Sequence, residues 1–259
     1  MIWGIFGAFE QEILSVIDHL EKSFETRWNR QPIFTGSINN QGAVVSPIGV
    51  GKARAAASVQ YLIDHYSIQK VFLIGAAGAL NPELKAGDVV IGQKSVQHDF
   101  DAGGKGALEE MKTSWLESDP ALTESALQAG EKIGLKDRMR LGTILTGDQT
   151  IISSEKKAWL WNTFQGDCVE MEGAAVAHVC SRNEVPFCLI RVITDFADEN
   201  ARSDFRRTFS ELVQIPARIV LAMLGQKEIR GITERNFHTR LRRFLQRQPG
   251  RYLRAFRKR

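Results

Sequence analysis

The stretch Val169–Val179, which reads VEMEGAAVAHV, constrains the fold more than any other part of the chain. Two carboxylates, Glu170 and Glu172, flank a methionine, and small apolar residues follow at once. Small residues of this kind predict a helix packed tightly against a sheet, and carboxylates at the start of a helix are favoured in their ionised form. An acidic pair at the edge of a core costs free energy unless a partner binds it. Sugar hydroxyls are one such partner, and an ordinary strand-to-helix junction is the equally weighted alternative.

Buried apolar segments alternate with helical ones along most of the chain. The expected strands are Ile2–Phe6, Ala43–Pro47, Val71–Ile74, Gly87–Gly92, Leu141–Leu145 and Pro186–Asp195. The expected helices are one opening at Glu10, then Ala53–His65, Leu122–Gly134, Lys156–Phe164, Gly173–Val179 and Phe205–Leu224, the last with a kink at Pro216. Residues 101–118 are polar and glycine-rich, which predicts a surface loop. This alternation predicts one α/β domain with helices on both faces of a sheet.

The net charge of +4 is divided unevenly along the chain. From Gln226 onward there are 12 Lys or Arg residues against two acids, which leaves 22 basic and 28 acidic residues before it. The last part therefore carries +10 and the preceding part −6. We expect a folded domain at residues 1–225 and a basic tail at 226–259. The high pI belongs to the tail and does not indicate that the domain binds nucleic acid.

The tail has the pattern of a basic amphipathic helix. Phe237, Leu241, Phe244 and Leu245 fall on one helical face with arginines around them, and the pattern resumes after Pro249-Gly250. Such a helix is typical of segments that lie on an anionic membrane surface. Binding to RNA or to a partner subunit fits the same pattern, and a solubilising tail without a partner fits at least as well.

The cysteines and the N-terminus indicate a cytoplasmic protein. Cys168, Cys180 and Cys188 lie among apolar neighbours without metal-ligand spacing, which is typical of structural thiols in a reducing compartment. The first residues lack the basic start and long apolar region of a signal peptide. No segment reaches the roughly 18 apolar residues of a membrane span. Any membrane association is expected to be peripheral, through the tail.

Three charged residues follow or end predicted strands. Glu12 comes just after the first strand, where α/β folds place their ligands, although an ordinary first-turn glutamate is the likelier interpretation from its position alone. Arg191 and Asp195 lie toward the end of the buried strand at 186–195, where a full charge is seldom only a solvated surface group. These two residues are therefore site candidates, and an internal Arg–Asp salt bridge is the alternative.

Two further segments resemble known ligand-binding motifs only in part. The segment Gly49–Arg54 has the glycines and lysine of a phosphate loop, but Ala53 replaces the Ser or Thr of that motif, so we expect a tight strand-to-helix turn. His98, Asp99 and Asp101 have no second histidine or cysteine nearby to complete a metal site. We expect neither a metal nor an organic cofactor.

Seven motifs taken together resemble a known family. They are GIFGAFEQE (4–12), IGVGKA (48–53), GAAGAL (75–80), GDVV (87–90), TGD (146–148), VEMEGAA (169–175) and RVITDFAD (191–198). In this order they resemble the purine nucleoside phosphorylase superfamily and, within it, the 5′-methylthioadenosine/S-adenosylhomocysteine nucleosidases. The last two motifs are the specific ones, and the resemblance covers residues 1–225. It implies a three-layer α/β/α fold with a central mixed, partly barrel-like sheet, and a homodimer with each site near the interface.

The resemblance implies a role for each matching residue. Asp195 matches the acid at N7 of the departing purine, and Glu12 matches the carboxylate that activates the attacking water. Glu172 matches the group that binds the ribose 2′- and 3′-hydroxyls, with Met171 packing on the sugar. Arg191 matches an arginine that positions the water and the ribose end of the site. Breaking an N-glycosidic bond builds positive charge on the sugar and negative charge on the base, so an acid and a base carboxylate suit the reaction.

Other substrate contacts are less well matched. The resemblance places Ala76, Ile151 and Phe9 at the substrate, but Ala76 stands where the nucleosidases usually have serine. Thr150 stands where they have an aromatic residue on the adenine, and Gly103–Gly106 replaces an expected aromatic segment. Losing a stacking ring weakens base binding by about 1 kcal/mol unless another aromatic, such as Phe9 or Phe196, replaces it.

The expected activity is hydrolysis of an adenine nucleoside of the methylthioadenosine type to adenine and a (thio)ribose, a reaction of methionine salvage. Phosphorylases of the family carry an arginine and, three residues later, a serine for phosphate, whereas this chain has Leu73 and Ala76. Arg27, Arg30 and Arg54 keep phosphorolysis open as an alternative. An adenosyl-lipid substrate and a non-catalytic nucleoside-binding protein are the remaining alternatives.

Overall fold

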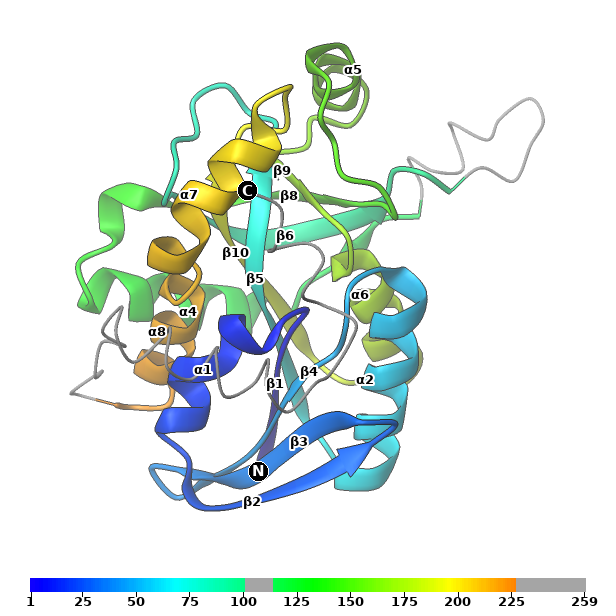
Figure 1. Cartoon of the computed structure of the whole chain (residues 1–259). Coiled ribbons are helices and arrows are strands. Elements are labelled where there is room, and N and C mark those ends of the chain that lie inside the picture. Colours follow the sequence, from blue (N-terminus) through cyan, green and yellow to red (C-terminus); the bar gives the residue numbers. More distant parts are fainter. Residues whose placement is uncertain (101–113, 227–259) are drawn as a thin grey trace. The chain divides into compact units, whose positions relative to one another are not determined.

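The computed structural model describes residues 1–100 and 114–226 (Figure 1). The strands are β1 (Ile2–Gly7), β2 (Glu21–Trp28), β3 (Gln31–Ile38), β4 (Gln41–Pro47), β5 (Lys70–Ala79), β6 (Val89–Gln97), β7 (Leu116–Glu117), β8 (Met139–Thr146), β9 (Cys168–Glu170) and β10 (Phe187–Asp195). The helices are α1 (Glu10–Asp18), α2 (Lys52–Tyr66), α4 (Pro120–Lys132), the short 3₁₀ helix η1 (Lys136–Arg138), α5 (Ser154–Phe164), α6 (Gly173–Arg182), α7 (Ala201–Leu212) and α8 (Ile215–Met223). The expected tail at 226–259 and most of the expected loop at 101–118 lie outside the described residues.

The strands form one mixed sheet that closes on itself at one end. The strand order is β10-β6-β8-β9-β5-β1-β4-β3-β2, and β10 also pairs with β5. This second pairing closes β5, β10, β6, β8 and β9 into a five-stranded ring. Pairings in the ring are both parallel, as between β5 and β10, and antiparallel, as between β6 and β10. The predicted mixed, partly barrel-like sheet is confirmed.

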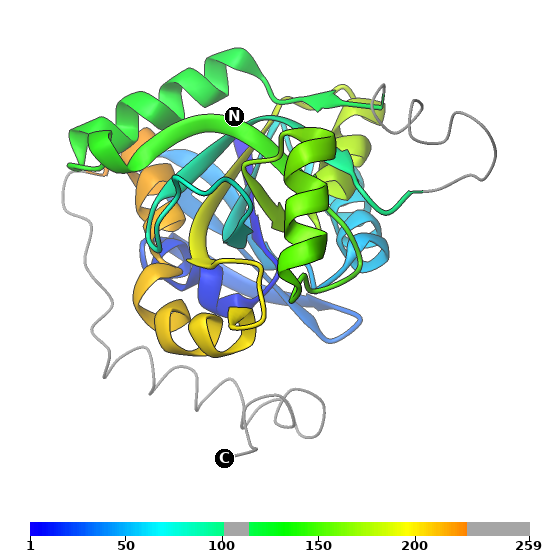
Figure 2. The ribbon, with the colours of Figure 1, turned by 90° about the horizontal axis from the view of Figure 1, so that it is seen from above.

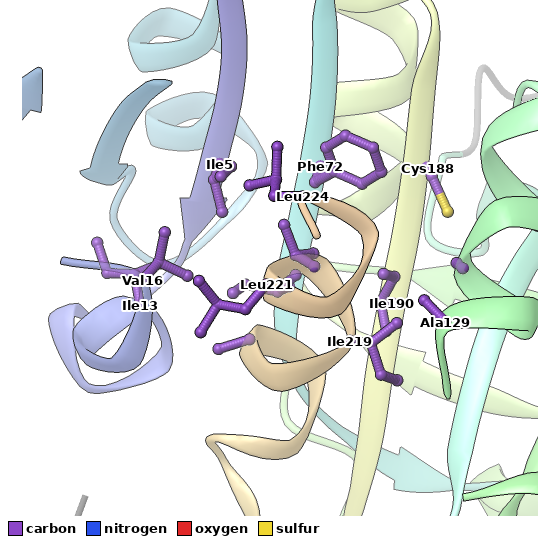
Figure 3. Close-up of a cluster of buried hydrophobic side chains, with 14 of the residues drawn as sticks. Ile5, Ile13, Val16, Phe72, Ala129, Cys188, Ile190, Ile219, Leu221 and Leu224 are labelled. Carbon is purple, nitrogen blue, oxygen red and sulfur yellow. The ribbon is translucent and has the colours of Figure 1, made fainter. Parts of the chain in front are cut away.

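Helices cover both faces of the sheet, as the alternating pattern predicts (Figures 1 and 2). On one face α1, α4 and α8 pack against β1, β5 and β10 through a core that includes Ile13, Ile190 and Ile219 (Figure 3). On the other face α2 and α6 contribute Leu62 and Val176 to a second apolar cluster. The apolar residues on the two faces of the sheet are thus covered by helices, whereas charged residues such as Glu170 and Asp195 lie at strand ends.

The predicted helix at 205–224 is wrong as a single element. Two helices, α7 and α8, occupy this region, and α7 begins at Ala201. Pro216 lies in the first turn of α8 and does not kink a continuous helix. A proline fits there because the first N–H groups of a helix have no intrahelical acceptor.

The hairpin of β2 and β3 was missed from the sequence. Its first strand, Glu21–Trp28, is exposed along almost its whole length, so it lacks the apolar alternation that marks a half-buried strand. The turn that joins the strands contains Asn29 and Arg30, both with positive φ. The hairpin extends the sheet past β4 at the edge away from the ring.

In residues 1–100 and 114–226, no helix combines the length and the apolar composition needed to cross a bilayer.

Leu189 and Leu141 provide a matched test of the apolar cluster to which α2 and α6 contribute. Leu189 on β10 is fully buried, whereas Leu141 on β8 is 44% exposed. Replacing Leu189 with alanine leaves a cavity, so we expect the free energy of unfolding in urea to fall by about 2–5 kcal/mol. Leu141→Ala is the control and should change it by less than about 0.5 kcal/mol. Equal losses in the two variants would mean that this cluster is not a packed core.

Candidate active site

Glu12 is buried where β1 passes into α1. It lies in the first turn of α1 and is only 2% exposed. Its Oε2 accepts a hydrogen bond from Phe9 N–H at 2.9 Å, and its Oε1 accepts one from Ala76 N–H on β5 at 3.0 Å. Burial raises the pKa of Glu12, although Arg191 and the backbone N–H groups act in the opposite direction. Glu12 is thus a fixed carboxylate whose raised pKa suits a base.

Gly75 on β5 lets Glu12 and Arg191 approach each other. Arg191 is the register partner of Gly75 on the neighbouring strand β10. A Cβ on Gly75 would lie 2.6 Å from Arg191 Nη1 and would also overlap the Glu12 carboxylate. The absence of a side chain at this position therefore brings a base candidate and a cation together across β5.

Arg191 is almost fully buried and forms an ion pair with Glu170. Its Nη2 donates to Glu170 Oε2 and lies 3.9 Å from Glu172 Oε2. Burial acts to lower the pKa of Arg191, but the surrounding carboxylates raise it, so the guanidinium keeps its charge. The Arg191–Asp195 salt bridge that the sequence left open is not among the ion pairs of the described residues.

Glu170, one of the two carboxylates in the stretch 169–179, was not assigned a site role of its own from the sequence. Besides Arg191 it accepts hydrogen bonds from Thr146 Oγ1 and from the backbone N–H groups of Glu172 and Gly173. Thr146 Oγ1 in turn accepts from Ala174 N–H at 2.8 Å. Glu170 thus has the partners that a buried carboxylate requires, and it fixes Arg191 at the start of α6.

Glu172 is less completely engaged. It is 4% exposed at the N-cap of α6, and its Oε1 accepts from Gly51 N–H at 2.8 Å. Burial and the negative charge of Glu170 raise the pKa of Glu172 to about 8, against the opposing effect of Arg191. Its Oε2, 3.9 Å from Arg191 Nη2, is beyond hydrogen-bond distance of that guanidinium, which leaves this oxygen available to a ligand.

Asp195 ends β10 and is half-buried. Its Oδ1 accepts from Ala197 N–H at 3.1 Å and its Oδ2 accepts from Thr194 Oγ1 at 3.0 Å. Burial raises the pKa of Asp195, although both hydrogen bonds act to lower it. An aspartate that keeps its proton to higher pH than usual is suited to act as an acid.

Strand β5 sets the spacing between the acid and base candidates. Ala76 N–H binds Glu12, and Gly78 lies against Asp195, since a Cβ on Gly78 would be 2.7 Å from Asp195 Oδ1. Two residues along a strand span about 7 Å. The two carboxylates therefore meet β5 at points separated by about the width of a small ligand.

The structure places the other predicted contacts less uniformly. Met171, which separates Glu170 and Glu172 in the sequence, is half-buried, as are Ala76 and Phe9. The ring of Phe9 also contacts that of Phe209 on α7 edge to face, with 6.0 Å between the ring centroids. Ile151 is buried in a separate apolar cluster that includes α5. The described contacts join Ile151 to this cluster and not to the carboxylates.

Asp99 ties loops together instead of forming a metal site with His98. Asp99 accepts from Lys52 Nζ at 2.5 Å and from Asp148 N–H at 2.8 Å. Asp101, the third residue of the weak metal pattern, lies outside the described residues. Within the parts of the chain that the structure describes, no three His, Cys, Asp or Glu side chains are grouped to hold a metal ion.

Leu73 and Ala76, which stand where the phosphorylases have an arginine and a serine for phosphate, carry no charge. The three arginines that kept phosphorolysis open are Arg27, Arg30 and Arg54. Leu73 is fully buried in the apolar cluster beneath α2 and α6. Arg27 is paired with Glu25 on the exposed hairpin, and Arg54 donates to Val50 O at 3.0 Å. Arg30 lies exposed in the turn of the same hairpin.

Comparison with known proteins identifies the family and the fold. A family model described as the phosphorylase superfamily matches residues 3–225. The chain is 31% identical over 223 residues to the aminodeoxyfutalosine nucleosidase of Campylobacter jejuni, which covers 85% of this chain and 96% of that protein. It is 32% identical over 228 residues to the 5′-methylthioadenosine/S-adenosylhomocysteine nucleosidase of Staphylococcus carnosus, which covers 85% and 98%.

Solved structures give the same result. The nucleosidase of Neisseria meningitidis in complex with methylthio-immucillin-A superimposes with a TM-score of 0.80 at 30% identity, covering 86% of this chain and 98% of that one. The native futalosine hydrolase of Helicobacter pylori superimposes with a TM-score of 0.80 at 28% identity, covering 87% and 97%.

The raised pKa of Glu172 predicts a dependence of stability on pH. Because the folded pKa of about 8 exceeds the ordinary value of 4.5, the folded state binds this proton more tightly, and stability falls as pH rises between these values. Glu172→Gln removes this loss, so the variant should gain stability relative to the wild type by at least ~1 kcal/mol between pH 5 and pH 8.

Urea unfolding at pH 5, 6.5 and 8 measures this difference. Glu211→Gln, at an exposed carboxylate on α7, is the control and should follow the wild type at every pH. Parallel curves for Glu172→Gln and the wild type would contradict the raised pKa.

Proposed function

The chain belongs to the phosphorylase superfamily, and we propose that it is a nucleosidase that hydrolyses the N-glycosidic bond of an adenine nucleoside. The observation that carries this proposal is the arrangement of Glu12, Glu172 and Asp195 around β5, each with a raised pKa. Two of these carboxylates flank a buried arginine, and the third lies further along the same strand. This is the set of groups that separation of a sugar from a base requires.

In the proposed reaction Asp195 donates a proton to the departing base. As the bond to the sugar breaks, negative charge develops on the base, and protonation makes it a better leaving group. The raised pKa of Asp195 keeps a larger fraction of it protonated near neutral pH than an ordinary aspartate would have. Thr194 and Ala197 hold the carboxyl group at the end of β10 through the two hydrogen bonds described above.

Glu12 is the proposed base that takes a proton from the attacking water. Two backbone N–H groups fix its carboxylate, so its orientation does not have to be set during the reaction. The Arg191 guanidinium lies against the same position beside Gly75 and supplies positive charge next to Glu12. Glu172, with one oxygen on Gly51 and the other available, is the proposed ligand of the ribose hydroxyls.

The group at the 5′ position of the sugar is the part of the substrate that the relatives leave open. Their names specify 5′-methylthioadenosine, S-adenosylhomocysteine and aminodeoxyfutalosine, at nearly equal identity to this chain. We propose an adenine nucleoside of the methylthioadenosine type as the substrate, and with it a place in methionine salvage. We also propose, from the family resemblance, that the protein is a cytoplasmic homodimer with each site near the interface. Gel filtration with light scattering measures the oligomeric state.

Release of free base tests the reaction directly. Methylthioadenosine, S-adenosylhomocysteine, aminodeoxyfutalosine and adenosine are each incubated with the protein, with and without phosphate. We expect adenine from at least one of the first three at a rate that phosphate does not change. Asp195→Asn should lower kcat by about 10²–10⁴-fold, the usual contribution of a general acid.

The same assay separates the alternatives. Release only with phosphate, together with ribose-1-phosphate as product, would replace hydrolysis by phosphorolysis. Binding without release from any of the four nucleosides would favour a binding protein. Wild-type turnover by Asp195→Asn would contradict the proposed role of Asp195 as the acid.

For the tail at 226–259 we propose contact with anionic membrane surfaces, on its charge of +10 and on the helical spacing of its apolar residues in the sequence. The full chain should co-sediment with phosphatidylserine-containing vesicles, and the chain truncated after Gln226 should not, while both release base at equal rates. Neutral phosphatidylcholine vesicles are the control. Equal sedimentation of the two chains would exclude membrane binding through the tail. Salt-sensitive binding of the full chain to RNA, without binding to vesicles, would indicate that the tail binds nucleic acid instead.

A further inference from the structure

Four segments that are distant in the sequence are tied together behind Glu172. They are the turn Gly49–Lys52 that opens α2, Asp99 after β6, Thr146–Asp148 at the end of β8, and Glu172 itself. Each of the four hydrogen bonds that join them connects residues at least 47 positions apart. A network built only from such long-range contacts fixes loops relative to one another, and none of its aspartates has a role in the reaction proposed above.

The network ends on Glu172 through one backbone group. Gly51 N–H donates to Glu172 Oε1 at 2.8 Å. Gly51 has φ of +95°, a conformation that residues with a side chain rarely adopt. The direction of this N–H is therefore a property of the turn and depends on whatever holds the turn in place.

Asp148 holds the turn at the next residue. Its Oδ1 accepts from Lys52 N–H at 2.8 Å, and a Cβ on Gly51 would lie 3.0 Å from the same oxygen. Thus one carboxylate oxygen lies against Gly51 and binds the N–H that follows it. Because Asp148 also satisfies a donor at the start of α2, it acts as an N-terminal cap supplied from another segment.

Asp99 fixes Asp148 and closes the network. Its Oδ2 accepts from Asp148 N–H at 2.8 Å, and its Oδ1 accepts from Lys52 Nζ at 2.5 Å. The two side chains of this ion pair are only 17–18% exposed. Burial alone would raise the pKa of Asp99, but Lys52 and the Asp148 N–H outweigh it, so Asp99 stays charged. The turn is thereby held at both the backbone and the side chain of Lys52.

We propose that Asp148 and Asp99 are positioning residues that keep Gly51 N–H on one oxygen of Glu172 and so turn the other oxygen to the sugar hydroxyls. This proposal rests on the proposed function, because it takes Glu172 as the group that binds the ribose. Without the network, Glu172 loses the donor that opposes Arg191 and is free to rotate toward the guanidinium 3.9 Å away. The two aspartates then determine how strongly the enzyme prefers a ribose to a 2′-deoxyribose.

The first test compares 5′-methylthioadenosine with its 2′-deoxy analogue. Asp148→Ala should lower kcat/KM about tenfold for the ribonucleoside and less than twofold for the deoxynucleoside, which has no 2′-hydroxyl to misplace. Asp148→Asn keeps an acceptor oxygen for Lys52 N–H and should restore at least half of the wild-type preference. Asp119→Ala removes a carboxylate that binds Leu122 N–H at 2.9 Å at the start of α4, and this control should leave the preference unchanged.

The second test needs no turnover. Hydrogen exchange of the Gly51 amide, followed by NMR, should be at least tenfold faster in Asp148→Ala and in Asp99→Ala than in the wild type. Asp119→Ala should leave this amide unchanged. Unchanged exchange at Gly51 in the first two variants would overturn the positioning role, even if the enzyme acts on a different nucleoside.

The outcomes separate the two proposals. If Glu172→Gln lowers kcat/KM selectively for the ribonucleoside but Asp148→Ala lowers it equally for both substrates, the positioning role is wrong and the proposed function stands. If Glu172→Gln affects both substrates equally, Glu172 does not bind the 2′-hydroxyl, and both the ribose role of Glu172 and the positioning proposal built on it fail.

Discussion

The buried ion pair between Glu170 and Arg191 is the interaction on which the site depends. Both side chains are almost completely removed from water, which costs several kcal/mol for each ion unless partners replace the lost hydration. Glu170 recovers this cost through Thr146, two backbone N–H groups and the guanidinium. Because these partners come from β8, the start of α6 and β10, the pair can form only when the ring of strands is closed.

The pair also sets the electrostatics of the remaining carboxylates. Glu12 and Glu172 both lie near the guanidinium of Arg191, which Glu170 has already engaged. For each of these two carboxylates, the loss of hydration on burial raises the pKa more than the attraction of Arg191 lowers it. A site that placed a second arginine here would stabilise the folded state but would return both carboxylates toward ordinary pKa values. The raised pKa values of Glu12 and Glu172 are thus maintained at a cost in stability, as is common at active sites.

The sequence predicts those features that short-range patterns encode. Continuous apolar runs predict β1 and β10. A full charge at the end of such a run, as at Asp195, indicates a candidate site residue. The partner of Arg191 was out of reach, because Glu170 and Arg191 meet through the pairing of distant strands and no spacing in the chain predicts it. The pairing of β10 with β5 joins two strands that are distant in the sequence, so no local pattern encodes it, and the barrel-like sheet was expected only from the family resemblance. The exposed strand β2 was missed because it has no local apolar signal.

The same charge arrangement bears on the choice between water and phosphate as the nucleophile. A phosphate dianion next to Glu12 would have to be bound close to a buried carboxylate, which requires uncommitted positive charge or several N–H donors. The cation beside Glu12 is Arg191, whose charge is shared with Glu170 and Glu172. Ala76 N–H, a donor at this point of β5, is engaged by Glu12 itself. A neutral nucleophile avoids this conflict, because water can donate to Glu12 and needs no counter-charge. The residues that make Glu12 a base therefore also disfavour an anionic nucleophile, so that one arrangement of charge favours hydrolysis over phosphorolysis.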